Sequence, residues 1–116
     1  PTNIVDSAPR FTKDMYIEGT YQCLSFQFKK ILSTIKGGMI LTDDKDFYDW
    51  AQLAVHDGRD MGVPYEEDKM QVLGYHMFMT PETAEMGLEN FIKNKVVNED
   101  VAGSYTYPDI SYIKDL

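Results

Sequence analysis

Lys30 stands in a setting that could make a lysine chemically reactive. It follows a run of aromatic and apolar residues, Tyr21 to Phe28 (YQCLSFQF), and precedes Ile31 and Leu32. A lysine held in a partly desolvated pocket has a lowered pKa, and its neutral amine is then a nucleophile. The competing interpretation is that Lys29 and Lys30 are two solvated loop lysines, because lysine side chains are mostly exposed. The local pattern therefore indicates a candidate residue and leaves both interpretations open.

The sequence holds a few other polar residues, and their types and positions alone give little reason to rank them. Asp6 ends a short apolar run, Ser25 lies five residues before Lys30, and His76 lies just before a predicted helix start. Each also has a structural interpretation: Asp6 as a turn or capping residue, Ser25 as a buried hydroxyl, His76 as a histidine bonded to backbone. We expect His56 to be structural. Two histidines without a Glu-x-x-His or cysteine partner lack metal-ligand spacing, so no metal site is predicted.

The strands that would position these residues are short. Residues 4–5 are typical of the end of a buried strand, residues 21–28 suit a second strand, and residues 39–42 suit a third. A turn signal, Gly37–Gly38, precedes the third run. The second and third runs are close enough to pair, joined by a connection that contains Lys30.

Two helices are predicted after the strands. The first is capped by Asp43 or Asp44, has apolar residues at three-to-four-residue spacing, and stops near Gly58. Residues 60–70 are polar and suit an exposed loop. The second helix begins at Thr80-Pro81-Glu82, where a hydroxyl can cap and proline suits the first turn. Its predicted apolar stripe comprises Ala84, Gly87, Leu88, Phe91 and Ile92. Strands alternating with helices predict an α/β fold.

Composition excludes several classes of protein. With 43% hydrophobic and 26% charged residues the chain resembles a globular domain. Its 19 acidic and 11 basic residues give a net charge of −8, which would repel a phosphate backbone, so nucleic-acid binding is not expected. No apolar run approaches the roughly 18 residues of a membrane span, and no signal peptide is visible. The single cysteine, Cys23, rules out an internal disulfide and fits a reducing, cytoplasmic location.

The segment around Lys30 resembles the active-site segment of the DegT/DnrJ/StrS sugar aminotransferases. The string Ser25-Phe26-Gln27-Phe28-Lys29-Lys30 is followed, without a gap, by GGMILTDD over residues 37–44. In that family a Ser-Phe-x-x-x-Lys run leads into a Gly-Gly segment that ends in Thr-Asp/Asn-Asp. The family lysine binds pyridoxal 5'-phosphate as a Schiff base. The register of the resemblance assigns that role to Lys30 and not to Lys29.

Three further segments match in the same order. Ile4-Val5-Asp6-Ser7-Ala8 is similar to the family's Asp-x-Ala motif, whose aspartate pairs with the pyridine nitrogen of the cofactor. The run at residues 58–60 (GRD) resembles a His-Gly-Arg segment, with His56 displaced by one residue. Residues 73–80 (LGYHMFMT) resemble a Gly-Tyr-Asn-x-Arg-Met stretch. Together the four segments span about residues 3 to 92.

The resemblance implies a set of roles. Lys30 would be the catalytic residue, and the cofactor would be bound by Lys30, Asp6, Ser25 and His76. Ser25 would bond to the cofactor phosphate, and His76, where the family usually has asparagine, would reach the phosphate of the neighbouring subunit. The implied reaction transfers an amino group, from glutamate, to a nucleotide-linked keto-sugar in a homodimer with shared active sites.

The resemblance also implies a fold and a domain organisation. Residues 1–95 would be a portion of the large, pyridoxal-phosphate-binding domain of a fold-type I aminotransferase. That domain has a mostly parallel sheet with flanking helices. Residues 96–116 would form an extended C-terminal tail. Family members are several hundred residues long, so we expect this chain to be part of a larger polypeptide or to assemble with another chain.

Several departures from the family pattern indicate a divergent branch. Pro9 replaces a glutamine or histidine that contacts the cofactor ring, Phe78 replaces an arginine, and Asp57 precedes Gly58 where histidine is expected. Lys30 argues against the dehydratase branch, which has histidine at that position. The alternative is a non-catalytic relative or assembly subunit that keeps the fold and dimer surface. A third alternative is an unrelated acidic α/β binding module.

Overall fold

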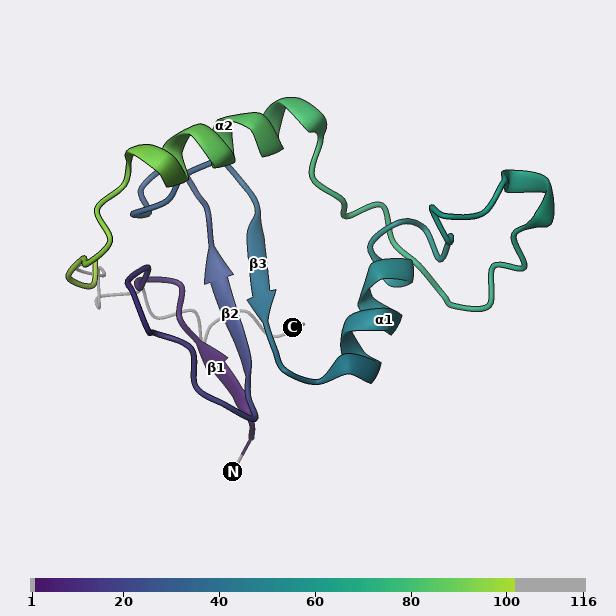
Figure 1. Ribbon diagram of the computed structural model, residues 1–116, viewed down its shortest axis with the longest axis horizontal. Coiled ribbons are helices and arrows are strands. Elements are labelled where there is room, and N and C mark those ends of the chain that lie inside the picture. Colours follow the sequence, from purple (N-terminus) through teal and green to yellow (C-terminus); the bar gives the residue numbers. More distant parts are fainter. Residues whose placement is uncertain (1, 102–116) are drawn as a thin grey trace, which may run out of the picture.

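The computed structural model describes residues 2–101, in which three strands form one sheet (Figure 1). The strands are β1 (Ile4–Asp6), β2 (Tyr21–Ser25) and β3 (Gly38–Leu41), in the spatial order β1-β2-β3. β1 and β2 are parallel, whereas β2 and β3 are antiparallel. The α/β class and the pairing of the second and third predicted strands are therefore confirmed.

The sheet is mixed rather than mostly parallel in the described residues. A parallel return needs a crossover, usually a helix, to carry the chain back across the sheet. The connection between β2 and β3 has no helix and turns back at the same edge: the Phe26 N–H donates to the Gly37 carbonyl (2.9 Å) and Thr34 N–H donates to the Phe26 carbonyl (2.9 Å). These bonds also explain why β2 ends at Ser25 and not at Phe28.

The hydrophobic core lies on one face of the sheet. Alternate residues of β2, Gln22 and Leu24, are buried there, and Phe26 and Leu32 from the following loop join them. Four partly buried side chains complete the cluster: Phe11, Met15, Leu41 and Met79. Residues of a strand alternate between faces, so Tyr21, Cys23 and Ser25 point to the opposite face.

Hydrogen bonds from the Gln22 side chain hold the segment that follows β1 against β2. Its side chain is 1% exposed, and its Nε2 donates to the Ser7 hydroxyl (2.8 Å) and to the Met15 carbonyl (3.1 Å). Its Oε1 accepts from the Ile17 N–H at 3.2 Å. A buried amide is costly unless its polar atoms are bonded, and these three bonds fix the segment just after Asp6.

Helix α1 (Lys45–Ala54) follows β3. Asp44 caps it as predicted, accepting a hydrogen bond from the Phe47 N–H at 3.0 Å. The other Asp44 oxygen accepts from the Tyr21 hydroxyl, which ties the helix start to β2. The helix ends at Ala54, earlier than the predicted stop near Gly58. Ala54 is its only buried residue. Of the other residues of the predicted apolar stripe, Phe47, Ala51 and Val55 are half-buried and Trp50 is exposed.

Helix α2 (Pro81–Lys93) begins as predicted, with Thr80 as its cap and Pro81 in the first turn. Figure 1 shows α2 (green) lying across the end of the sheet at which β2 stops. The predicted apolar stripe is only partly correct. Leu88 and Ile92 are exposed, Ile92 by 81%, because the helix contacts the rest of the chain through a line of residues that includes Gly87 and Phe91 but not Leu88 and Ile92.

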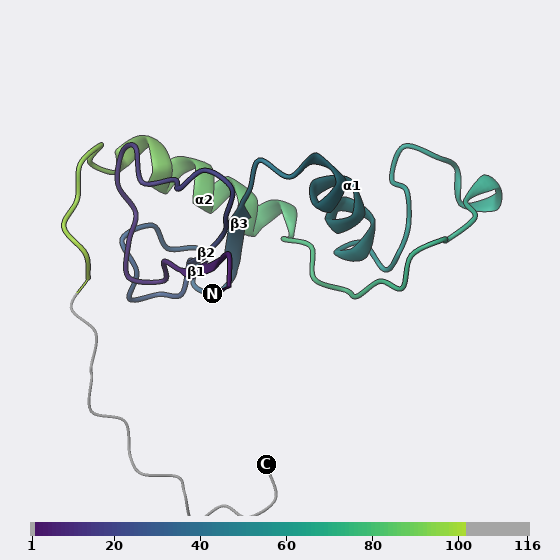
Figure 2. The same cartoon turned by 90° about the horizontal axis from the view of Figure 1, so that it is seen from below.

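Residues 56–80, here called the arm, project away from the sheet beside α1 (Figures 1 and 2). The arm contains a 3₁₀ turn, η1 (Tyr65–Glu67), within the loop predicted at residues 60–70. Its base is held by backbone bonds: Asp57 N–H to the Tyr75 carbonyl (3.1 Å), Tyr75 N–H to Ala54 (2.7 Å) and Met77 N–H to Val55 (3.0 Å).

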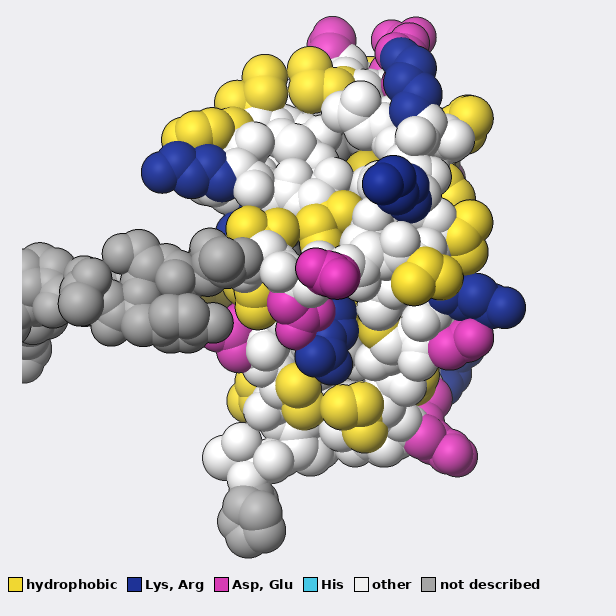
Figure 3. Space-filling model, turned by 90° about the vertical axis from the view of Figure 1, so that its left-hand side faces the viewer, with side chains coloured by type: hydrophobic (Ala, Val, Ile, Leu, Met, Phe, Trp, Pro, Cys, Tyr) yellow, Lys and Arg dark blue, Asp and Glu magenta, His cyan; other side chains and the backbone are white. Residues whose placement is uncertain are grey.

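Many large apolar side chains are exposed on the described part of the chain. Ile4 and Ile40 lie on the open face of the sheet, and Leu73 and Met77 lie on the arm. Figure 3 shows hydrophobic side chains (yellow) spread over the side of the molecule that it views. No helix that the structure describes is long and apolar enough to cross a membrane. Of the predicted tail, only residues 96–101 lie within the described part of the chain.

Candidate functional site

Asp6 and Ser25 lie at the same edge of the sheet. Each is the last residue of its strand, and β1 and β2 are parallel, so their carboxyl ends meet. Asp6 pairs with Cys23 in the register, and Ser25 is two residues further along β2. Their side chains therefore share the face opposite the hydrophobic core. The carboxyl edge of the strands is where α/β sheets commonly bind ligands.

The Asp6 carboxylate is partly engaged. Its Oδ1 accepts the Ala8 N–H at 2.9 Å, which is the turn role that the sequence left open. The side chain is exposed, and an ionised carboxylate has several acceptor positions on its two oxygens. Asp6 can therefore hold the turn and still accept a hydrogen bond from a ligand.

Lys30 lies in the lysine loop, defined here as residues 26–37, which leaves the sheet at the edge formed by Asp6 and Ser25. Its backbone N–H donates to the Gln27 carbonyl (2.8 Å), which makes a tight turn. Lys30 is half-buried, whereas Lys29 is exposed and its ammonium lies 5.4 Å from the centre of the Phe28 ring. Among residues 2–101, no carboxylate lies within ion-pair distance of the Lys30 amine.

Ser25 connects the strand to this loop. Its Oγ accepts the Gln27 N–H at 3.4 Å, which is the backbone contact expected of a structural hydroxyl. The bond uses an acceptor position, so the hydroxyl proton of Ser25 can still be donated to a ligand. The structure therefore places a carboxylate, a hydroxyl and the loop that carries the half-buried residue Lys30 at one edge of the sheet.

The lysine loop contains a strained residue. Ile35 has φ = 72°, a conformation that is rare for a β-branched residue, and its side chain is 62% exposed. Such conformations cost about 1–3 kcal/mol and persist only where the surroundings impose them. Here the Thr34 hydroxyl donates to the Lys36 carbonyl (2.6 Å) and Ile35 N–H donates to the Ser33 hydroxyl (3.1 Å), which close the loop around it.

Replacing Ile35 with glycine is therefore expected to stabilise the protein. Glycine tolerates this φ, and the exposed side chain loses little burial, so the free energy of unfolding should rise by about 1 kcal/mol. Urea denaturation measures the change. Ile35→Ala is the matched control, because alanine also removes the side chain but keeps a Cβ at positive φ. Equal effects of the two substitutions would contradict the assignment of strain to this residue.

His76 lies apart from the other predicted site residues. It sits on the arm, its side chain is 76% exposed, and its Nδ1 lies 2.9 Å from the Asp57 carboxylate. It lines a cleft of about 540 Å³ with His56, Phe78, Lys36 and Gly38. Because Gly38 pairs with Ser25, this cleft adjoins the same sheet edge on the β3 side. Asp6, Ser25 and Lys30 are not among its lining residues.

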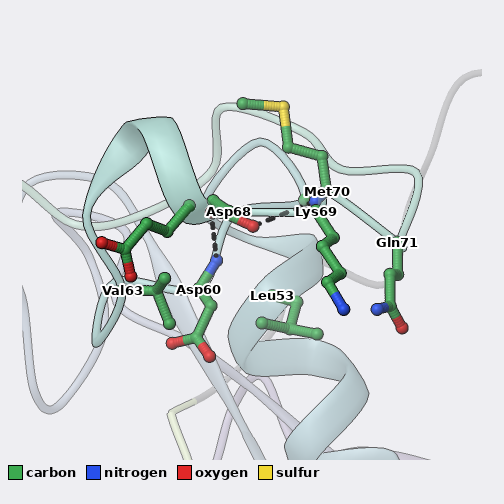
Figure 4. A pocket seen from close by; sticks show the side chains of 9 residues that line it. Leu53, Asp60, Val63, Asp68, Lys69, Met70 and Gln71 are labelled. Carbon is green, nitrogen blue, oxygen red and sulfur yellow. Dashed lines mark hydrogen bonds between the residues drawn. The ribbon is translucent and has the colours of Figure 1, made fainter.

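The arm holds a carboxylate, that of Asp68, which sequence reasoning did not single out. The Asp68 side chain is 5% exposed and accepts the N–H groups of Met70 (3.0 Å) and Asp60 (2.9 Å), as Figure 4 shows. The Met70 N–H, more than that of Asp60, lowers the pKa of the Asp68 carboxyl against the opposing effect of burial. The Arg59 guanidinium lies beside Asp68 (3.6 Å) and over the Tyr65 ring (4.7 Å).

These contacts make Asp68 a structural anchor of the arm. The adjoining pocket of about 290 Å³ contains none of the predicted site residues. The part of the chain that the structure describes holds no group of three or more histidine, cysteine, aspartate or glutamate side chains placed to bind a metal.

The geometry thus defines an α/β protein in which a carboxylate, a hydroxyl and the loop that carries Lys30 lie at one sheet edge. Residues 17–102 match the model of the DegT/DnrJ/EryC1/StrS aminotransferase family. The match covers most of the chain, and the chain belongs to this family. Searches of curated proteins and of solved structures returned no match. The family is generally dependent on pyridoxal phosphate, and its aminotransferase type of activity is the coarse functional assignment for this chain.

Three of the groups present suit that cofactor. Pyridoxal phosphate offers an aldehyde, a pyridine nitrogen and a phosphate, for which an amine, a carboxylate and a hydroxyl are chemically matched partners. Lys30 has no carboxylate partner in the described range, the exposed Asp6 carboxylate can accept a further hydrogen bond, and the Ser25 hydroxyl can still donate one. These groups fit the cofactor.

Proposed function

We propose that this chain belongs to a pyridoxal-phosphate-dependent aminotransferase that transfers an amino group, from glutamate, to a keto-sugar carried on a nucleotide. The observation that carries the proposal is the shared sheet edge of Asp6, Ser25 and the loop bearing Lys30. Ser25 and Lys30 lie within the matched residues 17–102, Asp6 lies before them, and the motif resemblance gives all three residues cofactor-binding roles.

Each residue has a distinct task in this proposal. Lys30 is the point of covalent attachment, and its amine, once released by the amino donor, moves a proton at the substrate carbon. Asp6 keeps the pyridine nitrogen protonated by pairing with it. Ser25 donates a hydrogen bond from its hydroxyl to the phosphate. The bound cofactor supplies an electron sink for the carbanion formed at that carbon.

His76 and the exposed apolar surface support a proposal about assembly. We propose a homodimer with shared active sites, located in the cytoplasm, in which His76 from one copy reaches the cofactor phosphate of the other. His76 is exposed on a projecting arm, and a histidine can donate a hydrogen bond to phosphate. We also propose that residues 1–95 are a portion of a larger, mostly parallel domain, because the open face of the sheet exposes Ile4 and Ile40.

Reductive trapping tests the cofactor assignment. The intact protein is incubated with pyridoxal phosphate, reduced with borohydride, digested and mapped by mass spectrometry. We expect the reduced adduct on Lys30. An adduct confined to Lys29 or to another lysine, or the absence of any adduct, would overturn the assignment.

A specific observation favours a second candidate, a non-catalytic relative that keeps the fold and the dimer surface. Phe78 replaces the family's arginine and stacks on His56, with ring centres 5.2 Å apart and planes 10° apart. A stacked aromatic pair therefore occupies the position at which the family has an arginine. The same trapping experiment separates the two candidates, because the non-catalytic relative would form no adduct on Lys30.

A further inference from the structure

One face of α2 holds the lysine loop. The side-chain amide of Asn90 donates to the Ser33 carbonyl at 2.8 Å, and that of Asn94 donates to the Ile31 carbonyl at 3.0 Å. The partners are 57 and 63 residues apart in sequence, so these are tertiary contacts. Ile31 directly follows Lys30, and the Asn94 bond therefore fixes the backbone immediately beyond the candidate lysine.

The same face is shaped to approach the loop closely. Residues 87, 90, 91 and 94 recur at helical spacing and lie on one side of α2. A Cβ added at Gly87 would lie 3.0 Å from the Thr34 methyl group, so a larger residue would push the helix away from the loop. Phe91 packs edge-on against Phe11, with ring centres 6.2 Å apart, and thereby joins the helix to the core.

The Asn90 and Asn94 side chains bond to the residues that follow Lys30, where the backbone of the loop makes few other hydrogen bonds. On the amino-terminal side, the bond from its own N–H to Gln27 sets the turn. On the carboxyl-terminal side, the next bond between backbone groups of the loop is that of the Thr34 N–H to the Phe26 carbonyl, four residues from Lys30. A segment without helix or strand bonds opens easily unless side chains satisfy its carbonyls.

We propose that Asn90 and Asn94 are positioning residues that present the amine of Lys30, rather than that of Lys29, to the cofactor. This role rests on the proposed function of Lys30. The two lysines are adjacent, so a small rotation of the backbone exchanges which amine faces the sheet edge. The two amides prevent that rotation by holding the carbonyls of Ile31 and Ser33.

Two measurements on the intact protein test the role, with Asn90→Ala and Asn94→Ala as variants. Hydrogen exchange of the Lys30 and Thr34 amides should become about tenfold faster, as expected for the loss of a hydrogen bond that restrains local opening. After reaction with pyridoxal phosphate and borohydride, the fraction of adduct on Lys29 relative to Lys30 should rise. This ratio reports which amine is presented and does not follow from a general loss of stability.

Asn98→Ala is the matched control. Its side-chain amide also donates to two backbone carbonyls, those of Phe11 (2.9 Å) and Lys95 (2.8 Å), and neither belongs to the lysine loop. It should change neither the exchange of the loop nor the adduct ratio. An unchanged ratio in both test variants, with a normal adduct in the parent protein, would overturn the positioning role alone. No adduct in the parent protein would overturn the proposed function and this role with it.

Discussion

Replacing Lys30 with alanine is expected to lower kcat for amino-group transfer by about 10²–10⁴-fold, the range associated with a positioned proton-transfer group. The substitution also removes the attachment point, so borohydride should trap no adduct at residue 30. The side chain is half-buried in a loop and has no ion-pair partner within residues 2–101, so the melting temperature should barely change. Conversion of glutamate to 2-oxoglutarate by the cofactor-loaded protein measures the rate.

Two control variants test whether activity depends on the Lys30 amine itself. One keeps a positive charge at residue 30, and the other removes the neighbouring lysine. Lys30→Arg keeps a positive charge, but a guanidinium stays protonated and cannot replace the amine, so it should be as inactive as the alanine variant. Lys29→Ala should retain most activity because Lys29 is exposed and lies against Phe28. If Lys29→Ala were the inactive variant instead, the register that selects Lys30 would be wrong.

The elements that depend on local chemistry could be predicted from the sequence. Asp44 caps α1, and Thr80 with Pro81 starts α2, because each cap is a bond between residues three apart. The lysine loop and its two flanking strands were also predictable, since Gly37–Gly38 marks the turn. The sequence predicted the strand ends and the end of α1 at Ala54 less accurately, because backbone hydrogen bonds to distant residues determine where these elements end.

The contacts that complete the candidate site could not be predicted in this way. Asn90 and Asn94 look like ordinary polar residues of an amphipathic helix, and their partners are 57 and 63 residues away. The hydrogen bonds of Gln22 to the segment after β1 were also missed. The one sequence signal for them is that Gln22 is a polar residue on the buried side of a strand. Leu88 and Ile92 belong to the predicted apolar face but are exposed, whereas Gly87 and Phe91 of that face, together with the unpredicted Asn90 and Asn94, make the contacts of α2.

The arm is expected to be the part of the structure most sensitive to a single added methyl group. At Gly74 a Cβ would lie 1.7 Å from the Gly58 nitrogen and 2.1 Å from the Asp57 carbonyl carbon, and both contacts are with backbone. Backbone cannot rotate away as a side chain can, so Gly74→Ala must separate the two crossing segments. We expect it to destabilise the arm by about 3 kcal/mol or more, which lies in the range of severe overpacking.

Hydrogen exchange localises this effect. The N–H groups of Asp57, Tyr75 and Met77 form the base of the arm and should lose protection, whereas the Gly38–Leu41 amides of β3 should keep theirs. Gly62→Ala is the control, because it lies on the same arm and a Cβ there approaches only the Asp60 carboxylate, at 3.2 Å. The Asp60 side chain can move aside, so this variant should behave like the parent protein. Equal protection in the two variants would contradict the prediction that the close crossing of Gly58 and Gly74 determines the stability of the arm.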